Sequence, residues 1–141
     1  MILVLDASVV LKWFFQMHDD ENHVSHALEI LAGIDAGHIQ MVQPPHFLAE
    51  VAAVLAREKP SGAKTDLIDL QNMEWQMVDN PSVYRMATDI SVQLQHHLFD
   101  TLYHATALLV PEARFVTADE RYYEQARETG NVTLLADFRI E

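Results

Sequence analysis

Short apolar runs in this chain alternate with longer segments in which apolar residues recur every three or four positions. Residues 1–6 are apolar up to Asp6 without alternating polar positions, a pattern typical of a strand buried on both faces. Arg114–Thr117 is a further predicted strand. Ile39–Val42 and Val132–Leu135 are further short runs of this kind. We interpret the stretch near Trp75–Val78 as one more strand, although it could also extend the helix before it.

The segments between these runs carry the helical spacing of apolar residues, and prolines and glycines mark their ends. Pro44-Pro45 opens one helix and Pro60-Ser61-Gly62 closes it, and Thr65 is an expected cap of the next. His18–Glu21 is a polar break. The other predicted helices are Ser8–Phe15, Val24–Ile34, Thr65–Asn72, Pro81–Leu94, Phe99–Leu109 and Glu120–Glu128.

Alternation of short buried strands with helices predicts a parallel sheet covered on both sides. We therefore expect an α/β fold, a three-layer α/β/α sandwich around a central, mostly parallel, twisted sheet. The 141 residues contain no internal repeat and no Gly/Ser linker, so we expect one domain over residues 1–141.

The amino-acid composition excludes several kinds of functional site. The absence of cysteine excludes disulfides, thiolate zinc sites and cysteine nucleophiles, and it is compatible with the cytoplasm. No apolar run approaches the roughly 20 residues of a membrane span, and no signal peptide is predicted at the N-terminus. The net charge of −12 is unusual for a protein that grips nucleic acid phosphates, unless metal ions, a local basic patch or a basic partner offset it.

Four carboxylates stand where apolar faces are expected. Asp6 and Asp119 each follow a predicted strand, and the carboxyl ends of parallel strands are where such sheets bind ligands. Glu50 borders the apolar face of its predicted helix, and Asp100 belongs to a nearly all-apolar helix in which we expect it to be enclosed. Burying unpaired charge is expensive, so these acids need a physical reason.

Each acid has an ordinary explanation when taken alone. Asp6 and Asp119 could cap the helices that follow them, Asp100 could sit at a helix N-terminus, and Glu50 could be a half-exposed flanking residue. Together, however, four neighbouring carboxylates repel one another unless a cation lies among them. Mg²⁺ or Mn²⁺ suits such a set of oxygen ligands.

Four segments resemble the PIN domain, and within it the VapC-type toxin ribonucleases of bacterial toxin–antitoxin pairs. They are Val4–Ser8, Pro44–Ala52, Phe99–Ala105 and Phe115–Asp119, and they follow one another in order over almost the whole chain. Thr101 departs mildly from the pattern, because a small residue such as alanine is usual there.

The resemblance implies a Mg²⁺- or Mn²⁺-dependent endoribonuclease with an acidic quartet of Asp6, Glu50, Asp100 and Asp119. The three aspartates would bind metal directly or through water, whereas Glu50 could be a ligand or could orient the attacking water. Ser8 and Thr117 would support the carboxylates, although both could be ordinary helix-start caps. The expected partners are RNA, a cognate antitoxin protein and a second copy in a homodimer.

Other residues leave alternatives open. His96 or His97 could contact substrate, His23 and His26 could form a surface transition-metal site, and His104 is expected to be a satisfied, partly buried histidine. Candidates for phosphate contact are Lys12, Arg85, Arg114 and Arg121, which could equally be solvated surface charges. Aromatic residues that could form a dimer face or simply belong to the core are Trp13, Phe14, Phe15 and Trp75.

The competing functions are a phosphoacceptor regulatory domain and a non-catalytic metal-binding module whose acidic pocket receives a basic peptide. The phosphoacceptor type needs a lysine after a late strand. The segment after the last predicted strand is Ala136-Asp137-Phe138, so its lack of a lysine counts against that class.

Overall fold

The computed structural model describes residues 1–16 and 22–140. Its strands are β1 (Ile2–Leu5), β2 (Gln40–Gln43), β3 (Gln76–Met77), β4 (Ala113–Thr117) and β5 (Val132–Leu134). They form one sheet in the order β3-β2-β1-β4-β5, and every pair of neighbours is parallel. The expected mostly parallel sheet is therefore confirmed.

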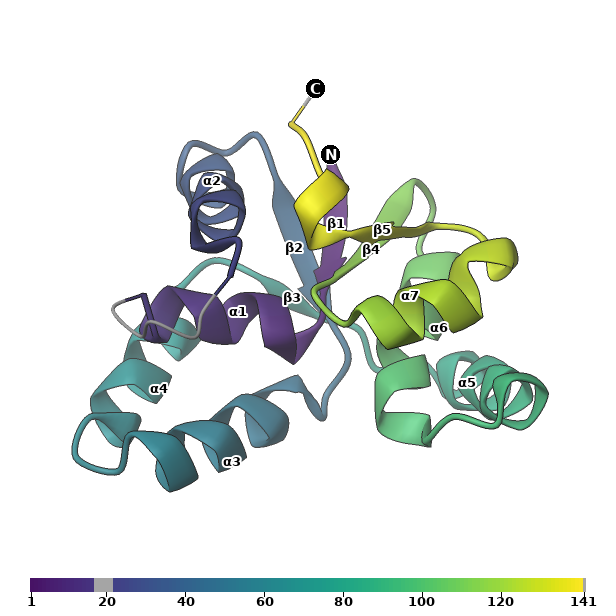
Figure 1. The fold of residues 1–141 in the computed structure, drawn as a ribbon, viewed down its shortest axis with the longest axis horizontal. Helices are drawn as coiled ribbons and strands as arrows, with labels where there is room; N and C mark the ends of the chain where they lie inside the picture. Colours follow the sequence, from purple (N-terminus) through teal and green to yellow (C-terminus); the bar gives the residue numbers. More distant parts are fainter. Residues whose placement is uncertain (17–21, 141) are drawn as a thin grey trace.

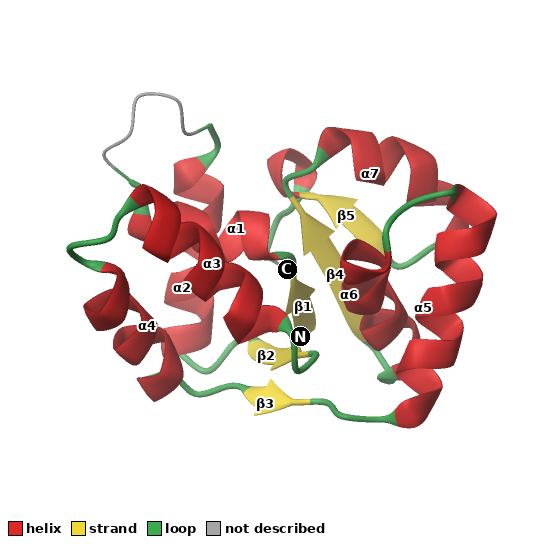
Figure 2. Ribbon diagram, turned by 90° about the horizontal axis from the view of Figure 1, so that it is seen from below, coloured by secondary structure: helices red, strands yellow, loops and turns green. Residues whose placement is uncertain are grey.

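Helices cover both sides of this sheet (Figures 1 and 2). Figure 2 shows α1 and α2 on one side of the central strands and α5 and α6 on the other. The helices are α1 (Ala7–Phe14), α2 (Val24–Asp35), α3 (Phe47–Glu58), α4 (Ala63–Asn72), α5 (Pro81–Leu94), α6 (Leu98–Leu109) and α7 (Glu120–Ala126). Two short 3₁₀ turns follow, η1 (Arg127–Thr129) and η2 (Leu135–Asp137).

The core lies where β1 and β4 run between the helical layers. Leu3, Val4 and Leu5 are fully buried, which confirms the expectation that the first strand is covered on both faces. Helix α6 packs against β1 and β4, and α5 packs on α6 through a smaller apolar cluster around Val83 and Ile90. The sheet is thereby a rigid base for the loops at its carboxyl edge.

A buried glutamine joins two strands at that edge. Gln43 Oε1 accepts a hydrogen bond from the Leu5 amide at 2.7 Å, and Gln43 Nε2 donates to the Leu5 carbonyl at 2.8 Å. The backbone pairing of β1 and β2 extends only as far as Leu3 and Met41, and the Gln43 side chain continues it beyond that point. The Gln43 amide thus provides hydrogen-bond partners for both backbone groups of Leu5, the residue directly before Asp6.

Several element boundaries differ from the sequence prediction. Thr65 is not a cap, because α4 already begins at Ala63 and Gly62 is its N-cap. The predicted helix to Glu128 ends as an α-helix at Ala126 and continues as η1. The polar break predicted at His18–Glu21 lies outside the described residues. No helix among the described residues is both long and apolar enough to cross a bilayer.

Candidate active site

The candidate site lies at the carboxyl edge of the two central strands. Asp6 follows β1, and Asp119 comes two residues after the end of β4. These strands are parallel neighbours, with Leu5 opposite Val116, so their ends meet at one edge of the sheet. The structure thus confirms the predicted positions of both aspartates, each between the end of a strand and the start of a helix.

Asp6 is held by hydroxyl groups in a nearly closed environment. Its side chain is the N-cap of α1 and accepts from the Ser8 amide at 3.3 Å, and its Oδ2 also accepts a very short hydrogen bond from Ser8 Oγ. Thr117 Oγ1 donates to the same oxygen at 3.5 Å. Burial raises the pKa of Asp6 to about 7, against the opposing effect of the Ser8 hydrogen bonds, and the charges of Asp100 and Glu50 add to the rise.

The same two hydroxyl groups connect Asp6 to the loop that carries Asp119. Ser8 Oγ accepts from the Ala118 amide at 3.2 Å, and Thr117 Oγ1 accepts from the Asp119 amide at 3.1 Å. Asp119 Oδ1 in turn accepts from the Tyr122 amide at 3.1 Å and caps α7. Ser8 and Thr117 therefore fix the relative positions of two carboxylates.

Glu50 enters from α3, and its position is set by a residue of α6. Tyr103 is fully buried, and its hydroxyl donates to Glu50 Oε1 at 2.6 Å. Burial and the nearby charge of Glu50 raise the pKa of Tyr103, so this hydroxyl stays a donor at neutral pH. His46 Nε2 lies 3.5 Å from the same carboxylate oxygen and 2.8 Å from the Phe99 carbonyl.

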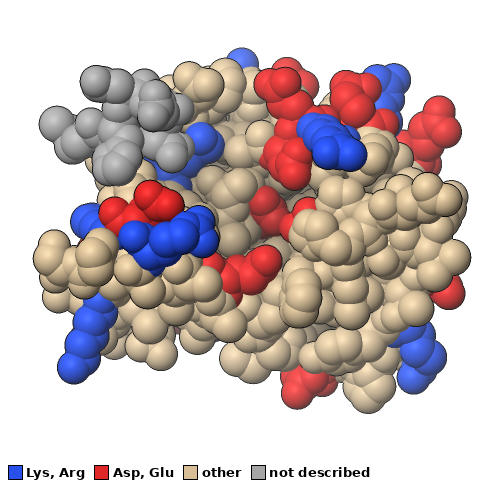
Figure 3. All heavy atoms as spheres, turned by 60° about the horizontal axis from the view of Figure 1, so that its bottom comes forward, with Lys and Arg blue, Asp and Glu red and all other residues tan. Residues whose placement is uncertain are grey.

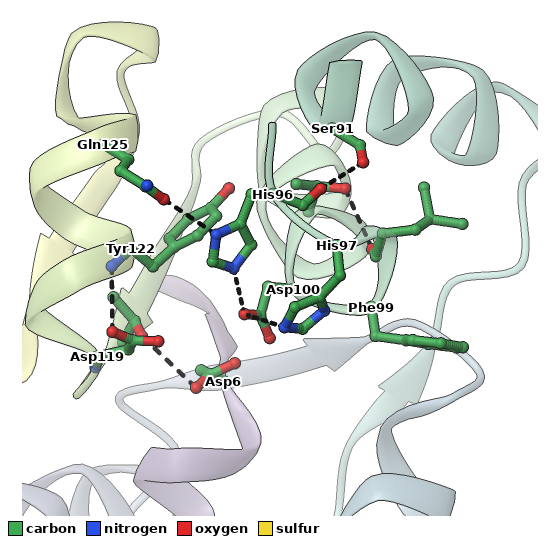
Figure 4. A network of polar contacts seen from close by, with 12 residues as sticks. Asp6, Ser91, His96, His97, Phe99, Asp100, Asp119, Tyr122 and Gln125 are labelled. Carbon is green, nitrogen blue, oxygen red and sulfur yellow. Dashed lines mark hydrogen bonds and ion pairs between the residues drawn. The ribbon is translucent and has the colours of Figure 1, made fainter. Parts of the chain in front are cut away.

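Asp100 lies in the first turn of α6, opposite Asp6. It is not enclosed as the sequence predicted, because its side chain keeps 20% of its exposure. The apolar helix buries its other side against the sheet and leaves this face toward the site. Oδ2 of Asp100 lies 2.6 Å from His96 Nε2 and 3.1 Å from His97 Nε2 (Figure 4).

These four acids, Asp6, Glu50, Asp100 and Asp119, are here called the carboxylate cluster. Figure 4 shows the aspartates turned toward one another, and Figure 3 shows acidic side chains gathered in the hollow of this face. Asp6 alone is buried, with 8% exposure; the others are partly exposed. Asp6 and Asp119 also cap helices. Each residue can therefore both cap a helix and belong to the carboxylate cluster.

The candidate phosphate contacts do not share one environment. Lys12 is buried, and Arg114 lies near the start of β4, where it lines a pocket with Met1 and Ile2 at the opposite edge of the sheet. Arg85 is exposed and bonds Ser82 within α5. Arg121, two residues after Asp119 in the first turn of α7, is exposed and stays a candidate.

Burial decides the predictions for Trp13, Phe15 and His104, whereas Phe14 and Trp75 are partly buried and stay candidates for either role. Trp13 and Phe15 are core residues with 5% and 6% exposure, so neither offers a dimer face. His104 is fully buried rather than partly, and its nitrogens contact the Tyr122 hydroxyl and the Gly130 carbonyl. Burial lowers the pKa of His104, which therefore acts as a neutral structural bridge.

Comparison with known proteins supplies the family. The PIN domain family matches residues 3–128, so this chain belongs to the PIN domain family. Among solved structures, the chain is similar to the crystal structure of VapBC2 from Rickettsia felis bound to a DNA fragment from their promoter. The TM-score is 0.65 at 16% identity, covering 95% of this chain and 97% of that chain, a likeness that shows the fold. Comparison with curated proteins found no match.

The structure adds residues that sequence reasoning did not assign to the site. Tyr103, His46 and Gln125 contact the carboxylate cluster or the histidines beside it. Tyr103 could have been found from its place three residues after Asp100, on the same helical stripe. Gln125 carries no comparable signal, because only the packing of α7 against the α5–α6 turn brings it close.

Proposed function

We propose that this PIN domain is a Mg²⁺- or Mn²⁺-dependent endoribonuclease and that the carboxylate cluster is its active site. The observation that carries the proposal is the burial of Asp6 beside three further carboxylates, those of Asp119, Asp100 and Glu50. Burial and the neighbouring charges of Asp100 and Glu50 raise the pKa of Asp6 to about 7, and a bound dication would offset both effects.

The donor set fits a hard cation. All four side chains of the cluster offer carboxylate oxygens, the ligands that Mg²⁺ and Mn²⁺ prefer. When bound, such an ion lowers the pKa of a water molecule and neutralises charge that develops on a phosphodiester. Asp6, Asp100 and Asp119 are the proposed metal ligands, and Glu50 either binds the metal or orients the attacking water.

The neighbouring residues would hold these carboxylates in place before substrate arrives. Ser8 and Thr117 direct Oδ2 of Asp6, which leaves Oδ1 available. Tyr103 engages Oε1 of Glu50, so Oε2 can accept a proton from water or face a metal. Such preorganisation keeps the reacting groups from having to reorient during the reaction.

We further propose that the protein is the toxin of a type II toxin–antitoxin pair and acts in the cytoplasm. Similarity to the crystal structure of VapBC2 supports an antitoxin partner. The net charge of −12 suits basic antitoxin side chains, and an Arg or Lys that reaches the carboxylate cluster would compete with the metal. A homodimer is part of the same proposal.

A cleavage assay tests the nuclease proposal. Untagged protein is treated with EDTA, supplied with Mg²⁺ or Mn²⁺ and given a mixed pool of RNAs. We expect Asp6→Asn and Asp100→Asn to lower cleavage at least about 100-fold, because each removes a charged ligand. Asp35→Asn, an exposed acid at the end of α2, is the matched control and should cleave normally.

Two results would contradict the assignment. Full activity in Asp6→Asn or Asp100→Asn would remove the carboxylate cluster from catalysis. Metal binding without cleavage of any RNA would favour a non-catalytic module that receives a basic peptide.

A further inference from the structure

Two histidines beside the carboxylate cluster share one oxygen of Asp100. They follow Gln95, whose left-handed backbone (φ 53°) ends α5 and turns the chain toward the site. The imidazole rings of His96 and His97 stack with centroids 4.7 Å apart, and both Nε2 atoms face Asp100 Oδ2 (Figure 4). Nothing in the proposed nuclease reaction uses either histidine.

The three side chains have the spacing of metal ligands. One ligand atom from each of His96, His97 and Asp100 lies within 4.8 Å of the other two. A tetrahedral Zn²⁺ site with bonds of about 2.1 Å needs ligand atoms roughly 3.4 Å apart. The observed contacts to Asp100 are 2.6 and 3.1 Å, so opening each by less than about 1 Å makes room for the ion.

The outer contact of His96 has the form found around metal-bound histidines. Its Nδ1 lies 3.0 Å from Gln125 Oε1 of α7, and this amide oxygen accepts the Nδ1 proton. With Nδ1 oriented by this amide, Nε2 of His96 points at Oδ2 of Asp100, the oxygen that His97 Nε2 also approaches.

We propose that His96, His97 and Asp100 bind a Zn²⁺-class transition-metal ion. Two imidazoles and one carboxylate favour Zn²⁺ over Mg²⁺, which prefers oxygen ligands. His97 keeps 64% of its side-chain exposure, so the ion has an open approach from solvent. Asp100 belongs both to this zinc site and to the carboxylate cluster. Zinc bound here therefore uses one of the four carboxylates of that cluster.

Zinc titration of the untagged, EDTA-treated protein tests the site, with calorimetry as the readout and circular dichroism as the check on folding. We expect one high-affinity Zn²⁺ per chain. His96→Ala and His97→Ala should each weaken it at least about tenfold, as loss of a ligand does. His96→Gln keeps a hydrogen-bond donor beside Asp100 but removes the imidazole, and it should weaken zinc equally.

Two controls separate this site from other histidines and from the nuclease. His38→Ala, at an exposed position between α2 and β2, should bind zinc normally. Asp6→Asn should bind zinc normally even where RNA cleavage is lost, so failure of the nuclease proposal leaves this inference standing. Unchanged zinc affinity in both His96→Ala and His97→Ala, or loss of zinc only in His23→Ala, would overturn it.

Discussion

At the scale of single residues, Asp6 makes the stability of the metal-free protein depend on pH. The pKa of Asp6 rises from an ordinary 3.8 to about 7, so the folded state keeps a proton that the unfolded chain releases between these values. The free energy of unfolding should therefore fall as pH rises from about 4 to 7, by on the order of 4 kcal/mol from this group. Urea unfolding in EDTA at several pH values measures it.

Asp6→Asn removes that titration and should make the EDTA-treated protein more stable than wild type at pH 7.5. Asp35→Asn changes the net charge equally and should leave the wild-type profile unaltered. Parallel pH profiles for wild type and Asp6→Asn would show that Asp6 is not protonated in the folded protein.

The hydroxyl of Tyr103 allows a second test at the residue scale, because it donates a hydrogen bond to Glu50. Tyr103→Phe should cost about 1 kcal/mol of stability, the usual net value of one hydrogen bond. Because Glu50 loses its fixed orientation, Mn²⁺ affinity should also fall, which calorimetry can measure. His104→Asn, which alters the buried contact to Tyr122 instead, should change stability without changing Mn²⁺ affinity.

The site residues differ in how far sequence reveals them. Asp6 and Asp119 were predictable because each directly ends an apolar run, and strand ends gather at one edge of a parallel sheet. The partial exposure of Asp100 was not predictable, since its helix is apolar nearly all round. The contact of Tyr103 with Glu50 joins residues 53 positions apart, and no local pattern encodes it.

At the scale of elements, α5 begins with a strong start signal. Asn80 accepts from the Ser82 amide at 2.9 Å, and Pro81 occupies the first helical turn. Asn80→Ala should lower stability by about 1 kcal/mol, and Asn80→Asp should keep most of it, because aspartate preserves the acceptor. Thermal unfolding distinguishes them, and equal losses in both variants would contradict the capping role.

Element boundaries were predictable where proline, glycine or an abrupt polar change marks them. The α5 start at Pro81 and the break at His96-His97 are confirmed. Thr65 misled because a threonine before an apolar stretch resembles a cap, whereas the backbone turn at Gly62 starts α4 one turn of helix earlier. The strand near Trp75–Val78 is confirmed only as the two residues of β3, since Gln76 and Met77 are exposed and gain little from pairing.

At the scale of the whole molecule, metal binding should be linked to folding. An ion that binds the folded state alone raises stability by RT ln(1 + [M]/Kd), about 2.7 kcal/mol at 100 times Kd. We therefore expect Mg²⁺ or Mn²⁺ to raise the melting temperature of wild type and of Asp35→Asn. Asp6→Asn should show a much smaller rise, and an equal rise would place the ion elsewhere.

The α/β class of the fold was predictable from the alternation of buried strands and amphipathic helices. The prediction was a mostly parallel sheet, and in the structure every pair of neighbouring strands is parallel. The strand order was not predictable, because sequence spacing does not say which strands become neighbours. The extent of the domain, residues 1–141, stays a prediction.

The brevity of the two outermost strands bears on how the protein behaves at high concentration. β3 has two residues and β5 has three, and they flank the longer central strands on either side. An unpaired strand edge is a template on which another chain can extend a sheet, and very short edges limit such growth. The molecule thus offers few free backbone groups for fibril-like stacking, although half its residues are hydrophobic.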